Sequence, residues 1–102
     1  MAIYIDDREL VAAHQAGDGE AFDELVREHR RSLLSHAKNK LHCDAASEDA
    51  LQETLVRAYK ALPRFNGEYR LGPWLHRIMS NVCIDEANRR KRDGEKTDQY
   101  AA

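Results

Sequence analysis

The sequence predicts an all-α fold, a compact bundle of about four helices linked by short connections. Apolar residues recur every three to four positions over most of the chain, which is the period of an amphipathic helix. Glycine and proline gather mainly between these periodic stretches, where they end helices and form turns. No stretch shows the strict alternation of a strand. With 102 residues, of which 42% are hydrophobic and 33% charged, the chain can build one modest core.

The first predicted helix is short and covers residues 8–16. Asp6 or Asp7 can cap its N-terminus, because a carboxylate there accepts hydrogen bonds from unpaired backbone amides. A Gly-Asp-Gly turn at residues 17–19 ends the helix, and Asp18 is well placed to cap the next one. The apolar positions of this first helix are Leu10, Val11 and Ala13.

The second predicted helix runs from about residue 20 to residue 40, and the acidic residues near its start suit the positive end of the helix dipole. A break is predicted at residues 42–44. Asp44 or Ser47 can then cap the third helix. The apolar positions of the second helix, at three-to-four spacing, are Phe22, Leu25, Val26, Leu33, Leu34, Ala37 and Leu41.

The third predicted helix, residues 46–62, has the clearest amphipathic pattern in the chain. Pro63 ends it, because proline lacks an amide hydrogen and disfavours the helical conformation of the residue before it. The apolar stripe consists of Leu51, Leu55, Ala58 and Leu62, with Ala50 and Tyr59 beside it. The polar residues away from this stripe are Glu48, Asp49, Gln52, Glu53 and Arg57.

A loop over residues 64–72 leads into the fourth predicted helix, residues 73–92. Pro73 occupies the first turn, a position that tolerates proline. Residues 93–102 are polar and have no period, so we expect a linker or disordered tail there and a single helical domain over residues 1–92. The apolar residues of this helix, expected in the core, are Trp74, Leu75, Ile78 and Val82.

The net charge of −2 conceals an asymmetry along the chain. Residues 1–56 hold 12 acidic and 6 basic side chains, whereas residues 57–92 hold 3 acidic and 9 basic ones. Residues 93–102 add 3 acids and 1 lysine. A chain polarised in this way suits an anionic partner on one side and a basic partner on the other. The alternative interpretation is that the charges simply occupy solvated helix faces.

Composition disfavours several classes of protein. No apolar run is long enough to cross a membrane and no secretory signal is visible, so we expect a cytoplasmic protein. Cys43 and Cys83 have no metal or redox spacing and are expected to be reduced thiols, with a disulfide or redox switch as the alternative. The five scattered histidines predict no metal site, and no cofactor is expected. No catalytic constellation is visible, so neither an enzyme nor a small-molecule substrate is predicted.

Several short motifs occur in one order: Gly17-Asp18 with Ala21-Phe22, Glu48-Asp49-Ala50-Leu51-Gln52-Glu53-Thr54, Phe65-Asn66-Gly67, Trp74-Leu75-His76-Arg77-Ile78, and Asn81 with Ile84-Asp85-Glu86 before the arginine run. Together they resemble the bacterial extracytoplasmic-function (ECF) sigma factors of the sigma-70 family, over about residues 7–92. The resemblance covers region 2 only. A helix-turn-helix domain usually follows in the family, so we expect this chain to be a domain of a longer protein, with a short natural protein as the alternative.

The resemblance implies that Asp49, Gln52 and Glu53 bind core RNA polymerase. In the family, the corresponding face of the helix grips a basic coiled coil of the largest polymerase subunit. Exposed acids and an amide suit such a surface, because charges steer the encounter and the amide both donates and accepts hydrogen bonds. Without the resemblance, an ordinary solvated helix face would be the better interpretation.

The resemblance also implies that Phe65, Asn66 and Gly67 form the loop that captures a flipped base of the promoter minus-ten element. Such a pocket needs an aromatic ring for stacking, an amide for the base edge and a glycine for close backbone approach. The alternative is a turn in which Phe65 plugs the core. Tyr69 and Arg70 flank the loop and are candidate contacts to the DNA strand.

In the fourth helix, the resemblance places Asn81 at promoter DNA, and His76 and Arg77 could share its exposed side. Asp85 is expected to pair with Arg89 one turn later rather than act as a catalytic acid. The cationic residues expected to contact phosphates are Arg89, Arg90 and Arg92, for which the alternative is a cationic cap at the helix C-terminus.

The predicted function is therefore that of a sigma factor domain, which docks on core RNA polymerase and recognises and melts the minus-ten element by holding the non-template single strand. An anti-sigma factor is a further expected partner. The sequence departs from the family at residues 71–73, where Gly72 and Pro73 replace its usual pattern. Pro73 favours an alternative, a degenerate sigma-like module that binds an anti-sigma factor or other regulator without binding DNA.

Overall fold

The computed structural model describes residues 7–65 and 70–101. Over these residues the chain forms four α-helices and one short 3₁₀ turn, which confirms the all-α prediction. In chain order the elements are α1 (Asp7–Gln15), α2 (Gly19–Leu41), α3 (Asp44–Ala61), the 3₁₀ turn η1 (Leu62–Arg64) and α4 (Leu71–Ala101).

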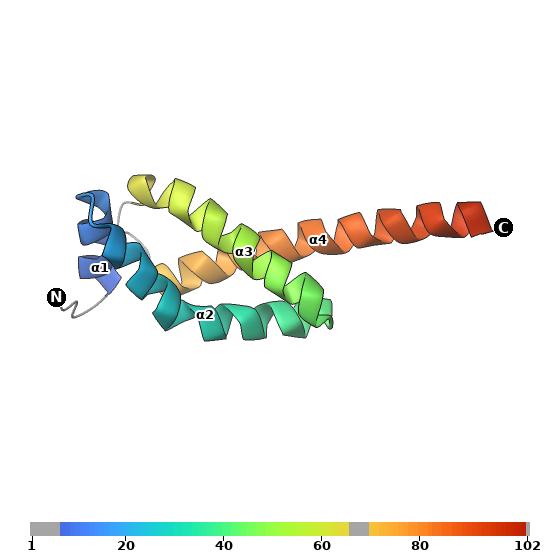
Figure 1. Ribbon diagram of the computed structural model, residues 1–102, viewed down its shortest axis with the longest axis horizontal. Coiled ribbons are helices and arrows are strands. Elements are labelled where there is room, and N and C mark those ends of the chain that lie inside the picture. Colours follow the sequence, from blue (N-terminus) through green and yellow to red (C-terminus); the bar gives the residue numbers. More distant parts are fainter. Residues whose placement is uncertain (1–6, 66–69, 102) are drawn as a thin grey trace.

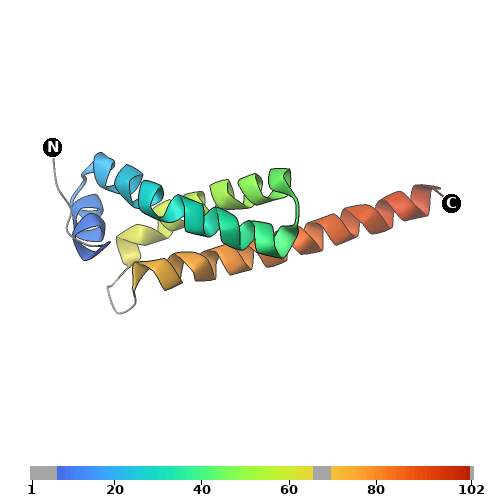
Figure 2. The same cartoon turned by 90° about the horizontal axis from the view of Figure 1, so that it is seen from below.

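The three long helices pack against one another, and the chain reverses direction between α2 and α3 and again between α3 and α4 (Figures 1 and 2). The short α1 lies at one end of the bundle, against the start of α2 and beside η1 (Figure 1). At the other end α4 continues past its neighbours, which stretches the molecule to 59 × 23 × 21 Å. The predicted bundle is thus present, with one helix much longer than the rest.

The core lies where α2, α3 and α4 meet, and it consists mainly of leucine and alanine. Thr54 and Ser47 are buried among these apolar residues, and the Thr54 hydroxyl donates to Sδ of Met79 over 3.5 Å. Met79, which the sequence interpretation did not place in the core, is fully buried one turn after Leu75. The largest fully buried apolar side chains are Leu10, Leu25, Leu33, Leu51, Leu62, Leu75 and Met79.

The helix starts agree with the sequence in one case and differ in another. Asp18 caps α2 as predicted, because its Oδ1 accepts a hydrogen bond of 3.0 Å from the amide of Glu20. The prediction that Asp44 or Ser47 caps α3 is wrong. Cys43 occupies the cap position without a side-chain capping hydrogen bond, Asp44 is the first helical residue, and Ser47 is buried one turn into the helix.

Helix α4 differs from the prediction at both ends. It begins at Leu71, so Pro73 lies in the first turn as expected, where its missing amide hydrogen costs no intrahelical bond. The first such bond runs from the Trp74 amide to the Arg70 carbonyl, over 3.3 Å. The helix also continues to Ala101, although a linker was expected after residue 92. No proline interrupts residues 93–101, and four of them, Glu95, Lys96, Gln99 and Ala101, are good helix formers.

Across the helices that the structure describes, none combines the length and the apolar character needed to cross a lipid bilayer.

Candidate nucleic-acid interface

The outer side of α3 carries the three residues predicted to bind polymerase. Asp49, Gln52 and Glu53 are all exposed and lie on one side of the helix, since they follow the i, i+3, i+4 spacing. Their placement on a solvent-facing side agrees with the sequence interpretation. The side chains form a polar strip whose carboxylates would attract a basic surface.

Arg57 links this strip to α4. Its Nε donates to Oε1 of Glu53 over 3.0 Å, and its Nη2 donates to Oδ2 of Asp85 over 3.1 Å. Both hydrogen bonds raise the pKa of the guanidinium, and the bond to Glu53 has the larger effect. The predicted pair of Asp85 with Arg89 is wrong, because Asp85 faces α3 and reaches the nearer guanidinium there.

The arginine run near the end of the bundle is partly neutralised by Glu86. Nη2 of Arg89 lies 2.7 Å from Oε1 of Glu86, and Nε of Arg90 lies 3.8 Å from the same oxygen. Of the three arginines predicted to contact phosphates, two therefore share an internal carboxylate, and Arg92 is exposed without a recorded ion pair in the described part of the chain.

Arg90 also reaches Cys43 at the start of α3, where its Nη2 lies 3.2 Å from Sγ. The pKa of the Cys43 thiol is lowered, first by the backbone amide of Ala46 and then by the Arg90 side chain. Cys83 is also a free thiol, and burial raises its pKa.

Phe65 marks the start of the predicted base-capturing loop. Its ring packs on Trp74, with ring centroids 4.9 Å apart and planes inclined by 55°, and both side chains are half-buried against the core. This is the packing that the alternative interpretation of Phe65 described. Arg70, at the far side of the loop, is exposed. Three further residues predicted to contact DNA, Asn66, Gly67 and Tyr69, lie outside the described residues.

Gln15, at the end of α1, fixes the chain where it enters this loop. Its Nε2 donates to the carbonyl of Leu62 over 3.0 Å and to the carbonyl of Phe65 over 2.9 Å. Sequence reasoning missed Gln15, because both partners are about fifty positions away in the chain and no local pattern signals the contact.

The outer side of α4 forms a polar stripe that begins close to the loop. Arg77 and Asn81 are exposed and share this side, as predicted. The same helical spacing continues the stripe through Ile84, which is 57% exposed, and Asn88 to Lys91. Extending the period from Asn81 would have identified these three positions from sequence alone.

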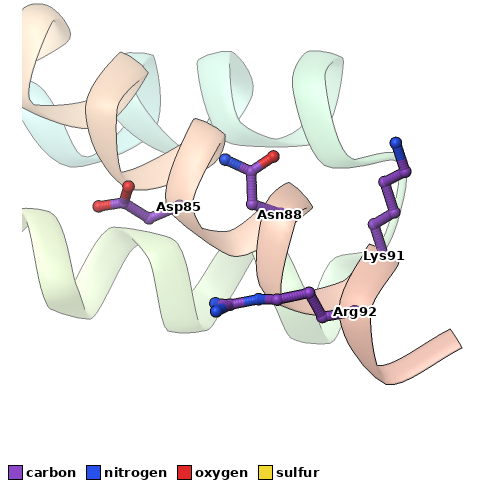
Figure 3. Close-up of a pocket in the computed structure, with 4 residues that line it drawn as sticks. All are labelled: Asp85, Asn88, Lys91 and Arg92. Carbon is purple, nitrogen blue, oxygen red and sulfur yellow. The ribbon is translucent and has the colours of Figure 1, made fainter. Parts of the chain in front are cut away.

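A shallow hollow of about 560 Å³ lies at the end of the stripe and is lined by Asp85, Asn88, Lys91 and Arg92. In Figure 3 the four side chains come from successive turns of α4 and spread over its surface rather than converge on one point. The hollow suits an extended polar chain better than a small molecule, because it is open and its polar groups are spread along the helix.

His76 does not share the exposed side of α4, contrary to the prediction. Its Nε2 lies 2.8 Å from the hydroxyl of Ser32, and its Nδ1 lies 2.8 Å from Nδ1 of His36, both on α2. The reason is geometric, since consecutive residues of a helix project about 100° apart. His76 therefore turns toward α2 while Arg77 turns toward solvent.

With this geometry established, the chain can be compared with known proteins. Residues 11–93 match the Sigma-70 region 2 family. The chain belongs to this family. The match covers α2, α3 and most of α4, including the polar strip of α3 and the stripe of α4.

The similar curated proteins of this family include ECF sigma factors. The chain is 40% identical over 85 residues to the ECF RNA polymerase sigma factor SigM of Mycobacterium tuberculosis, covering 83% of this chain and 43% of SigM. It is 40% identical over 71 residues to SigG of the same species, covering 70% of this chain and 19% of SigG. It is 30% identical over 77 residues to SigW of Bacillus subtilis, covering 76% of this chain and 41% of SigW. The chain thus spans less than half the length of these relatives.

A solved structure shares the region 2 fold. It is the NMR structure of the complex formed by an engineered region 2 of sigmaE with GTAAAA, to which the chain is 28% identical. The TM-score is 0.82, and the likeness covers 91% of this chain and 97% of that one.

Proposed function

We propose that this chain is a sigma factor domain that docks on core RNA polymerase and recognises and melts the promoter minus-ten element. The observation that carries the proposal is the likeness, over almost the whole chain, to a region 2 that was solved with GTAAAA. Polymerase would supply the chemistry of transcription, so the domain needs no catalytic residues of its own and would act in the cytoplasm.

The DNA-binding surface in this proposal combines the loop after Phe65 with the stripe of α4. Arg77 supplies a cation for the phosphate backbone, and Asn81 supplies an amide that can donate to and accept from a base edge. The loop residues Asn66 and Gly67 would hold a base taken out of the stack, which would offset the few kcal/mol that unpairing costs. Since Phe65 packs on Trp74, we expect it to support the pocket wall unless binding releases its ring.

The DNA part can be tested by fluorescence anisotropy with a labelled single-stranded minus-ten oligonucleotide. Asn81→Ala is expected to weaken binding about tenfold, which corresponds to about 1.4 kcal/mol. Arg77→Ala should also weaken binding. Its matched control is Arg27→Ala, because Arg27 is an exposed arginine on α2 and not on the stripe of α4. Equal binding by all variants, or no binding by the parent, would contradict the proposal and favour the regulator-binding module without DNA contact.

The polymerase-binding surface in this proposal is the strip of Asp49, Gln52 and Glu53 on α3. Pull-down of core polymerase should succeed with the parent and fail when Gln52 and Glu53 are both replaced by alanine. Lys60→Ala is the control, because Lys60 is exposed at the other end of the same helix. If the double variant binds as well as the parent does, this surface is excluded.

An anti-sigma factor is a second protein partner in this proposal. The exposed apolar side chains of Val56 and Tyr59 on α3, 47% and 56% exposed, support it, because a regulator could bury them. Co-purification of a regulator with the parent chain, and its loss with Tyr59→Ser, would test this part separately from polymerase and DNA binding.

A further inference from the structure

Two histidines join α2 to α4 through their ring nitrogens. Nδ1 of His36 lies 2.8 Å from Nδ1 of His76, although 40 positions separate them in the sequence. The outer nitrogens also have partners. Nε2 of His76 lies 2.8 Å from the Ser32 hydroxyl, and Nε2 of His36 lies 3.4 Å from the Ser80 hydroxyl. The four side chains, two from each helix, thus form one hydrogen-bonded row.

The two imidazole rings meet edge to edge. Their planes differ by only 12°, and their centres are 5.0 Å apart. This separation equals the 2.8 Å between the nitrogens plus about one ring radius on each side, so both nitrogens lie close to the line between the centres. The rings are therefore nearly coplanar, and the in-plane lone pair of one nitrogen points at the other.

Only one hydrogen can lie between the two Nδ1 atoms. One ring must donate and the other must accept, so the neutral pair holds opposite tautomers. The serine hydroxyls can satisfy either arrangement, because a hydroxyl both donates and accepts. A first added proton can bind the free outer nitrogen of the donor ring and leave the inner hydrogen bond in place. A second proton would put a hydrogen and a positive charge on both facing nitrogens.

We propose that His36 and His76 form a clasp between α2 and α4. Their hydrogen bond stays intact when the pair carries at most one extra proton and breaks when a second proton binds. The clasp goes beyond the function proposed above and does not depend on it. It joins α2 to the turn of α4 that also carries Arg77, whose side chain projects about 100° away from that of His76 and faces solvent.

The surroundings of the clasp also disfavour extra protons. The pKa of His36 is lowered, first by burial, then by His76 and then by Lys40, which lies one turn further along α2. From α4 the pair meets the uncharged Ser80, and α3 contributes no charge to the His36 shift within the described part of the chain. No acidic side chain is among the groups that shift the pKa of His36.

The sign of the pH dependence follows from this lowered pKa. The folded protein binds fewer protons at His36 than the unfolded chain, whose histidine has its ordinary pKa of 6.5. The stability that His36 contributes is therefore present above pH 6.5 and is lost as the pH falls toward the lower pKa of the folded state.

The first test is an NMR titration of the histidine rings in the full 102-residue chain. The signals of the His36 ring should change in two linked steps, because protons bind to the coupled pair rather than to one ring alone. In His76→Asn, whose amide can still bond to Nδ1 of His36 but cannot titrate, His36 should titrate in one step at higher pH. A single, unlinked step of the His36 ring at its ordinary pKa in the parent would overturn the proposal without requiring any variant to fold.

The second test compares urea unfolding at pH 7.5 and pH 5.0. The parent should lose more stability on acidification than His76→Asn does. His42→Asn is the control, because His42 is exposed, has a positive φ of 54° that asparagine tolerates, and lies outside the clasp. It should lose as much stability as the parent does. Equal losses in the parent and His76→Asn would overturn the proposal.

Discussion

At the scale of single residues, one side chain holds the entrance of the loop proposed to bind DNA. Gln15 donates to two backbone carbonyls that belong to η1 and to the first residue after it. These carbonyls lie just after α3, and the Leu62 carbonyl also accepts a hydrogen bond of 3.0 Å from the amide of Phe65. Gln15 therefore does for this turn what a cap does for a helix, from an element 47 to 50 positions earlier in the sequence.

Gln15→Ala is expected to lower the free energy of unfolding by about 1–3 kcal/mol, because two hydrogen bonds are lost and each contributes about 0.5–1.5 kcal/mol net. Gln15→Glu should cost more, since a carboxylate would face two carbonyl oxygens. Urea unfolding followed by the fluorescence of Trp74, the single tryptophan, would measure both changes. Gln52→Ala, at an exposed glutamine, should change stability by less than about 0.5 kcal/mol. A Gln15→Ala variant as stable as that control would contradict the capping role.

What could be predicted at this scale depends on separation along the chain. The Asp18 cap was predictable, because donor and acceptor are two residues apart. The bond of Arg57 to Asp85 was not, since the partners lie 28 positions apart and become neighbours only when α3 and α4 pack. The same holds for His76, which the sequence assigned to the wrong side of α4.

At the scale of elements, α4 has two different sides. Its inner side carries Leu75, Met79 and Val82, all buried, whereas Arg77, Asn81 and Ile84 face outward. The period of the sequence predicted most of this division. It did not predict the end of the helix, because residues 93–101 have neither an apolar stripe nor a proline to mark one.

Met79→Ala is expected to destabilise the fold by about 2–5 kcal/mol, because the side chain is fully buried and its removal leaves a cavity between α3 and α4. Ile84→Ala is a matched control on the same helix, since more than half of that side chain is exposed. Thermal unfolding by circular dichroism would compare the two. Similar melting temperatures for both variants would mean that α4 does not pack through Met79.

At the scale of the whole molecule, the charge asymmetry of the sequence is real but locally compensated. Glu86 forms ion pairs with two guanidiniums of the arginine run, and Asp85 forms one with Arg57. The exposed cations on the outer stripe and in the hollow at its end are Arg77, Lys91 and Arg92. Counting charges by segment does not show which side chains remain available.

The salt dependence of oligonucleotide binding should reflect these three cations and not every basic residue of the segment. If three cations neutralise phosphates on a single strand, log K should fall with log salt with a slope of about −2 between about 50 and 200 mM. Arg92→Ala should reduce the slope by about 0.7. Arg89→Ala should change it less, because Arg89 is already bonded to Glu86. A larger change for Arg89→Ala than for Arg92→Ala would show that binding breaks the internal pairs.

Because α4 extends beyond the bundle, a small change in its direction moves its far end by a larger distance. A helix of 31 residues is about 46 Å long, and contacts with the other helices hold it as far as Arg90, whose guanidinium meets Cys43. A tilt of the whole helix by about 5° would still move its far end by about 4 Å relative to its start. Small changes in packing inside the bundle are thereby converted into larger displacements near Ala101, so a probe at the far end would report on events inside the bundle.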